Sequence, residues 1–65
     1  MKENIGVNIL VLLSQGEKTF EEISELMPFD KQRIYMCIQH LYSAALIDMS
    51  GDNYVLSFDP KQYFS

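Results

Sequence analysis

The chain has 65 residues, which is enough for one small domain over residues 1–65 and too few for two. Hydrophobic residues make up 48% of the chain, enough for a small core, so a disordered chain is not expected. Nine acidic residues against five basic ones give a formal net charge of −4, which disfavours general attraction to nucleic acid. The distribution of this charge along the chain therefore matters for function.

The single cysteine, Cys37, allows no intramolecular disulfide and no metal site built from several cysteines. The apolar run of residues 5–13 superficially resembles a signal peptide, but it contains Asn8 and precedes Ser14-Gln15-Gly16-Glu17 instead of a small-x-small cleavage site. The run is also too short to span a bilayer. We expect a cytoplasmic protein that does not enter a membrane.

The first predicted helix covers about residues 3–14. Ile5, Ile9, Leu12 and Leu13 recur at helical spacing, and further aliphatic residues widen the apolar stripe. Gly16 then provides a stop for the helix. A stripe this wide predicts a helix that is buried on more than one side.

The second predicted helix covers about residues 20–27. Thr19 and Glu22 form a capping-box pattern at its start, and Pro28 forces the chain out of the helical region at its end. The apolar residues of this segment predict a buried stripe, made of Phe20, Ile23, Leu26 and Met27. The sequence therefore predicts a short helix with one buried side.

The third predicted helix covers about residues 30–45, with Asp30 as its N-cap. One continuous apolar face predicts its buried side, made of Ile34, Cys37, Ile38, Leu41, Ala44 and Ala45. The remaining positions are expected to face outward: Lys31, Gln32, Arg33, Tyr35, Met36, Gln39 and Ser43. Because only a tight turn separates it from the second helix, the two are expected to form a helix-turn-helix.

A two-stranded wing is predicted over about residues 46–58. The polar turn residues 50–53 separate two short runs of strand-forming residues. Tyr54, Leu56 and Phe58 alternate onto one face, which we expect to pack against the helices. In the tail, residues 59–65, we expect the aromatic pair Tyr63-Phe64 to return to the core or meet a partner. The predicted fold class is mainly α with a small β-hairpin.

From Ile9 to Phe58 the chain resembles the winged-helix proteins of bacteria and their phages, such as the ArsR and MarR repressors and the PapI-type pilus regulators. The resemblance is carried by residues 9–13, by residues 19–26 and by the apolar positions of residues 34–47. Ser24 stands where the family favours a small residue, and Ala45 where its members commonly carry Gly. The resemblance implies a winged helix-turn-helix, with three helices and a two-stranded wing, and a transcriptional regulator that binds double-stranded DNA.

In such folds the N-terminal half of the third helix enters the major groove. Arg can pair with guanine, Gln with adenine, and Lys with phosphate or guanine. The candidate DNA-contacting residues are Lys31, Gln32, Arg33, Tyr35, Met36 and Gln39 on this helix, with Asn53 in the wing.

The charge distribution favours contact through the third helix. Residues 30–47 carry two cations and one anion, whereas residues 1–29 and 48–65 sum to −3 and −2. The wing contains Asp48 and Asp52 where DNA-binding wings carry Arg or Lys, so contact of the wing with phosphate is not expected. An alternative is that Lys31 and Arg33 are ordinary charges on a solvent-exposed helix and contact no DNA.

The sequence offers little for catalysis or for a cofactor. His40 is expected to be a partly buried structural residue, and Cys37 a small buried hydrophobe, with redox sensing as its alternative. No second His or Cys and no carboxylate cluster stands at metal-ligand spacing. Because no nucleophile–base pair is visible either, we expect no enzyme, no metal and no cofactor.

Two functions remain open. The first is a DNA-binding regulator that forms a homodimer through the apolar face of helix 5–14 together with Tyr63 and Phe64. The second is an acidic interaction protein, such as an antirepressor, a polymerase-binding factor or a phage-type inhibitor, that binds another protein and not DNA. It would use the acidic helix 20–27, with the cluster Glu17, Glu21, Glu22 and Glu25, and the exposed Tyr35 and Met36.

Overall fold

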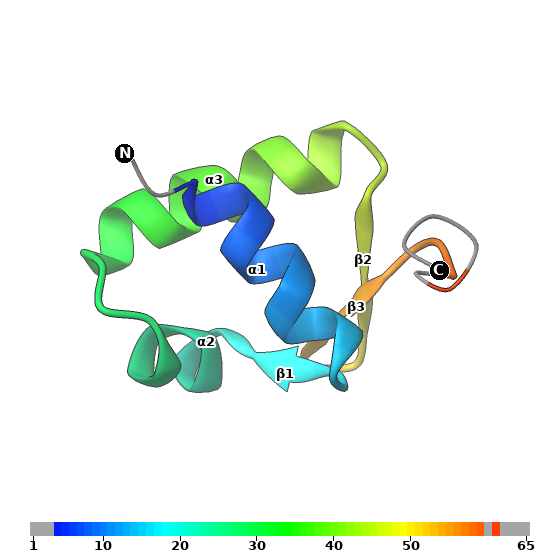
Figure 1. Cartoon of the computed structure of the whole chain (residues 1–65), viewed down its shortest axis with the longest axis horizontal. Helices are drawn as coiled ribbons and strands as arrows, with labels where there is room; N and C mark the ends of the chain where they lie inside the picture. Colours follow the sequence, from blue (N-terminus) through cyan, green and yellow to red (C-terminus); the bar gives the residue numbers. More distant parts are fainter. Residues whose placement is uncertain (1–3, 60, 62–65) are drawn as a thin grey trace.

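The computed structural model describes residues 4–59 and residue 61. In chain order its elements are α1 (Ile5–Ser14), β1 (Lys18–Thr19), α2 (Phe20–Leu26), α3 (Lys31–Ser43), β2 (Ile47–Ser50) and β3 (Asn53–Leu56) (Figure 1). The three strands form an antiparallel sheet with β3 in the centre. The three predicted helices and the predicted hairpin are therefore present, in a mixed α/β arrangement that has one strand more than expected.

Side chains fix where the first two helices begin. The Asn4 side chain accepts a hydrogen bond from the backbone amide of Val7 at 3.1 Å, so the described part of α1 starts at Ile5. At α2 the predicted capping box is confirmed. The backbone amide of Glu22 donates to Thr19 Oγ1 at 3.2 Å, and the Thr19 amide donates to Glu22 Oε1 at 2.9 Å.

The third helix ends earlier than the predicted residue 45. After Ser43 the chain turns at Ala45, whose φ of 61° lies in the left-handed region. The amides of Leu46 and Ala45 donate to the carbonyls of Leu41 and Tyr42, both at 3.0 Å, which is the Schellman pattern of a helix C-terminus. Ala44 and Ala45 are exposed, so their placement on the buried stripe was wrong because the helix stops before them.

The predicted hairpin is confirmed. Ser50 pairs with Asn53, so only Gly51 and Asp52 form its turn, and Gly51 adopts a φ of 63° that suits glycine. The unexpected strand β1 pairs with the other side of β3, where Lys18 faces Tyr54 and Thr19 faces Asn53. The hairpin is therefore joined along β3 to the segment that leads into α2.

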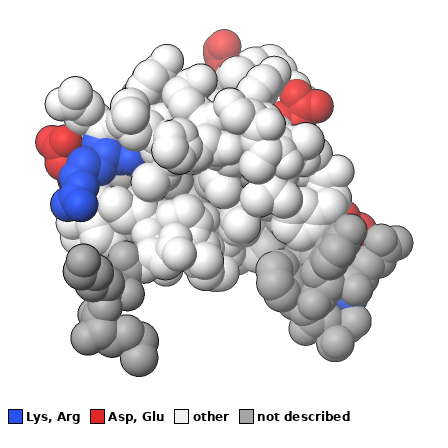
Figure 2. Space-filling model, turned by 90° about the horizontal axis from the view of Figure 1, so that it is seen from above, with Lys and Arg blue, Asp and Glu red and all other residues white. Residues whose placement is uncertain are grey.

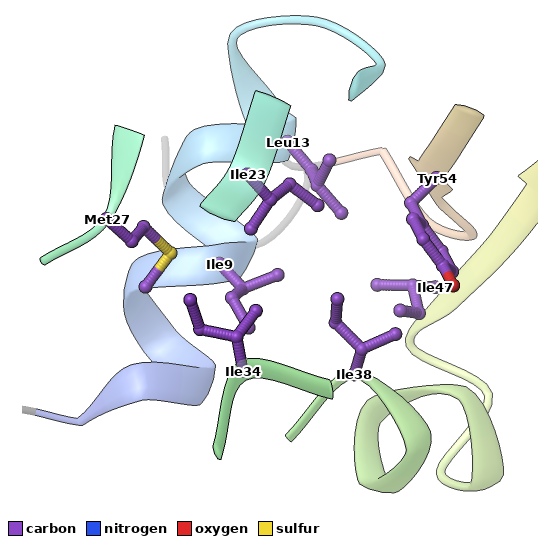
Figure 3. Packing of buried hydrophobic residues seen from close by; sticks show 8 residues of the cluster. All are labelled: Ile9, Leu13, Ile23, Met27, Ile34, Ile38, Ile47 and Tyr54. Carbon is purple, nitrogen blue, oxygen red and sulfur yellow. The ribbon is translucent and has the colours of Figure 1, made fainter. Parts of the chain in front are cut away.

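The core lies where the three helices meet the sheet, and its side chains point toward one another in Figure 3. It consists of Ile9, Leu13, Ile23, Met27, Ile34, Ile38, Ile47 and Tyr54. Leu26 was predicted on the buried stripe of α2 but is exposed, because Ile23 and Met27 already direct that helix inward. The predicted inward face of β3 is partly correct, since Tyr54 is buried whereas Leu56 and Phe58 are half-buried.

Two expectations concern the ends and the membrane. Tyr63 and Phe64 lie outside the described residues, so the structure says nothing of their predicted contact with the core or a partner. In the part of the chain that is described, no helix has both the length and the apolar character needed to cross a bilayer.

Candidate nucleic-acid interface

The outer face of α3 carries six of the seven predicted contact residues. Ile34 and Ile38 have no exposed surface and fix the rotation of the helix about its axis. The six predicted contact residues of this helix consequently face solvent, and all of them are exposed, namely Lys31, Gln32, Arg33, Tyr35, Met36 and Gln39. The structure thus presents them on one helix, within a little more than two turns.

The basic residues of this face gather at one end. Lys31 and Arg33 belong to the first turn of α3. The other predicted contact residues of this helix carry no charge. Figure 2 shows blue atoms at this end of the molecule, beside a broad surface of uncharged residues. The face therefore offers cations for phosphate or guanine at its start and neutral polar and apolar groups beyond them.

Tyr35 is held in place although half of its surface is exposed. Its ring lies edge-to-face against Phe20 of α2, with ring centroids 6.1 Å apart and an angle of 82° between the planes. Burial raises the pKa of the Tyr54 phenol on β3, and the nearby Tyr35 phenol raises this pKa further. Tyr35 therefore stands where α2, α3 and β3 meet, so a contact made by Tyr35 would have a defined geometry.

Asn53, the seventh predicted contact residue, is separate from this face. It lies on β3, and its side-chain amide donates a hydrogen bond to Glu17 Oε1 at 2.9 Å. This bond ties the hairpin to the segment before β1. Sequence reasoning missed the pair because the two residues are 36 positions apart and belong to no common pattern.

The hairpin itself is acidic and exposed. Asp48 and Asp52 both face solvent, and the Asp48 carboxylate accepts a hydrogen bond from the backbone amide of Met49 at 2.8 Å. Residues 47–56 contain no Lys or Arg, so the hairpin offers no side-chain cation to a phosphate. A nucleic acid on α3 would have to avoid these carboxylates or tolerate them.

Two residues of α3 differ from their predicted environment. His40 was expected to be partly buried but is exposed, because it lies about 120° around the helix from the buried Ile34. Cys37 is only half-buried, at the margin of the core. Among the described residues no group of three or more His, Cys, Asp or Glu side chains could hold a metal ion.

The four glutamates of the predicted acidic cluster are all exposed, but two of them have structural partners. Glu22 completes the capping box of α2, and Glu17 accepts the bond from Asn53. Glu21 and Glu25 stand one turn apart on the exposed side of α2. On the same helix, the Ser24 hydroxyl oxygen is buried without a hydrogen-bond partner among the described residues.

Comparison of the chain with models of known protein families, with curated proteins and with solved structures found no match.

Proposed function

We propose that the protein is a small cytoplasmic transcriptional regulator of the winged-helix type, without enzymatic activity, that binds double-stranded DNA through α3 as a homodimer. One observation carries this proposal: the six outward residues of α3 are all exposed, and both cations of this helix lie in its first turn. The N-terminal half of such a helix is the part that reaches base edges in a major groove.

The arrangement of elements supports the winged-helix assignment. Only residues 27–30 separate α2 from α3, which is the short connection of a helix-turn-helix. The hairpin β2–β3 follows α3 directly, and the Ser57 amide donates to the carbonyl of Leu46 at 3.1 Å, closing the base of the hairpin. The hairpin is thereby held beside the end of α3, as a wing requires.

The chemistry of the face supports contact with duplex DNA. Arg33 can pair with guanine, Gln32 and Gln39 with adenine, and Lys31 with a phosphate, while Met36 suits a thymine methyl group. Only two cations lie on the face, so the logarithm of the affinity should fall with that of the salt concentration with a slope of about −2. The binding of one copy is expected to be modest, and a second copy adds a second half-site.

A titration of a labelled random-sequence duplex at low and moderate salt tests the proposal. We expect binding that weakens with salt and weakens further in Arg33→Ala. Lys61→Ala is the matched control, because it removes the same charge from an exposed residue that is not part of α3. The absence of binding at low salt, or an equal loss in both variants, would contradict DNA contact through α3.

The acidic surroundings favour a second candidate, an interaction module that binds a protein instead of DNA. Glu21, Glu25, Asp48 and Asp52 are exposed carboxylates, and Tyr42 adds an exposed aromatic ring farther along α3. A photo-crosslinking residue placed at position 36 in cells distinguishes the two. Adducts with DNA support the regulator, and adducts with one protein species support the interaction module.

A further inference from the structure

The outer side of α1 exposes four uncharged residues, Val7, Asn8, Val11 and Ser14, and none of the described elements covers it. In Figure 1 α1 crosses in front of α3, so one of its sides faces away from the core. On that side Val7 and Val11 stand one turn apart, and each leaves 51% of its surface exposed. Covering the exposed part of these two valines would be favourable, because removing apolar surface from water is favourable.

A hollow lies beside Val11, between α1 and the connection from α2 to α3. Its volume is about 270 Å³, and it is lined by Asn8, Val11, Leu12 and Gln15 on one side and by residues 26–29 on the other. Leu26 stands at this hollow with 59% of its surface exposed. Protruding aliphatic side chains and a hollow therefore occur together on one side of the molecule, as a surface that fits its own copy requires.

This face is also free of charge. Residues 4–15 contain no Asp, Glu, Lys or Arg, and none lines the hollow, although the whole chain has a net charge of −4. Two copies of an acidic chain repel one another wherever their carboxylates approach. A face without charges is where two such copies can meet with the least repulsion, whereas a basic partner would find its attraction elsewhere on the molecule.

We propose that a second copy of this chain covers the α1 face, with the two α1 helices antiparallel across a two-fold axis. The inference rests on the homodimer of the proposed function and gives it a surface, but it does not depend on DNA binding. With the axis midway between Val7 and Val11, Val7 of one copy contacts the partner's Val11 at the edge of the hollow. The two valines are about 6 Å apart along the helix, which is one turn.

Sedimentation equilibrium of the full chain over a range of concentrations, without DNA, measures the dimer directly. We expect the wild-type chain to dimerise and Val11→Glu to weaken the dimer roughly tenfold or more, because it places carboxylates at the interface. Tyr42→Glu is the matched control, since it adds the same charge at a helical residue of similar exposure, 47%, on α3. Far-UV circular dichroism verifies that each variant is folded, and Val7→Glu replaces Val11→Glu if that variant unfolds.

A charge pair tests the antiparallel arrangement. The double variant Val7→Lys/Val11→Glu places each lysine against the partner's glutamate, so it should recover most of the dimerisation that Val11→Glu loses. Three results would overturn the proposal: a wild-type monomer at every concentration, equal weakening by Val11→Glu and Tyr42→Glu, or a double variant that remains as weak as Val11→Glu. Because no DNA is present, these failures are distinct from a failure of DNA binding.

Discussion

The two longest described helices, α1 and α3, contribute to the same core, but their solvent-exposed sides differ in chemical character. Ile9 of α1 and Ile38 of α3 are both fully buried among the same cluster of side chains. On its outer side α1 carries two valines, Asn8 and Ser14, with no charge. The outer side of α3 carries two cations, two glutamines and exposed aromatic residues. The inner faces are alike because both must fill one core, and the outer faces differ where packing imposes nothing.

This difference assigns the two proposed interactions to different helices. A surface for an acidic copy of the same chain has to avoid charge, and a surface for phosphate has to supply cations. Neither helix meets both requirements. The hairpin meets neither, because Asp48 and Asp52 are exposed and the Asn53 amide is engaged by Glu17.

The largest expected effect is the loss of stability when a buried isoleucine of α1 or of α3 is shortened, and it tests whether the two helices contribute equally to the core. Ile9→Ala and Ile38→Ala should each lower the free energy of unfolding by about 2–5 kcal/mol, since each leaves a cavity in a core to which the described part of the chain contributes eight buried side chains. Urea denaturation measures both. Val11→Ala, on the exposed side of α1, is the control and should cost less than about 1 kcal/mol. An equal loss at Val11 would mean that the outer face of α1 is already packed.

Substitution of the N-cap residue should destabilise the protein more at α1 than at α3. Asn4→Ala removes a side-chain acceptor from the Val7 amide and should cost about 1 kcal/mol. Asp30, the N-cap of α3, makes no such bond, so Asp30→Ala should cost only a few tenths of a kcal/mol through the lost helix-dipole interaction. Thermal denaturation of both variants checks the order, and a larger loss at Asp30 would contradict it.

The smallest expected effect concerns the C-terminal ends of the two helices, where one substitution should stabilise the protein. Gly16 follows α1, but α3 is followed by Ala45 at a φ of 61°, where a side chain is strained. Ala45→Gly should therefore raise the free energy of unfolding by about 0.5–1 kcal/mol, after allowing for the greater freedom of glycine in the unfolded chain. Ala44→Gly, at an ordinary φ of −82°, should lower it. Destabilisation by Ala45→Gly would contradict the strain.

Local signals in the sequence predicted much of this structure. The capping-box pattern of Thr19 and Glu22 predicted the start of α2, and the turn residues Gly51-Asp52 predicted the hairpin. The spacing of Ile34 and Ile38 predicted which side of α3 is buried. Each of these signals depends on residues within a few positions of one another. The exposure of the six contact residues on α3 followed from the same spacing.

Features that depend on distant parts of the chain were missed. Strand β1 has only two residues, Lys18 and Thr19, and exists because β3 pairs with it. The hollow beside α1 is formed by elements that come together only in the fold. The end of α3 was misplaced because alanine is a strong helix former, and only the turn toward β2 forces Ala45 into the left-handed region.

Amide chemical shifts recorded while a short duplex is added at low salt test DNA contact through α3 most directly. The largest changes should fall on residues 31–39, with small changes at the turn Gly51-Asp52 and on α1. Changes concentrated at that turn or on α1, or no changes while the protein stays folded, would contradict binding through the outer face of α3.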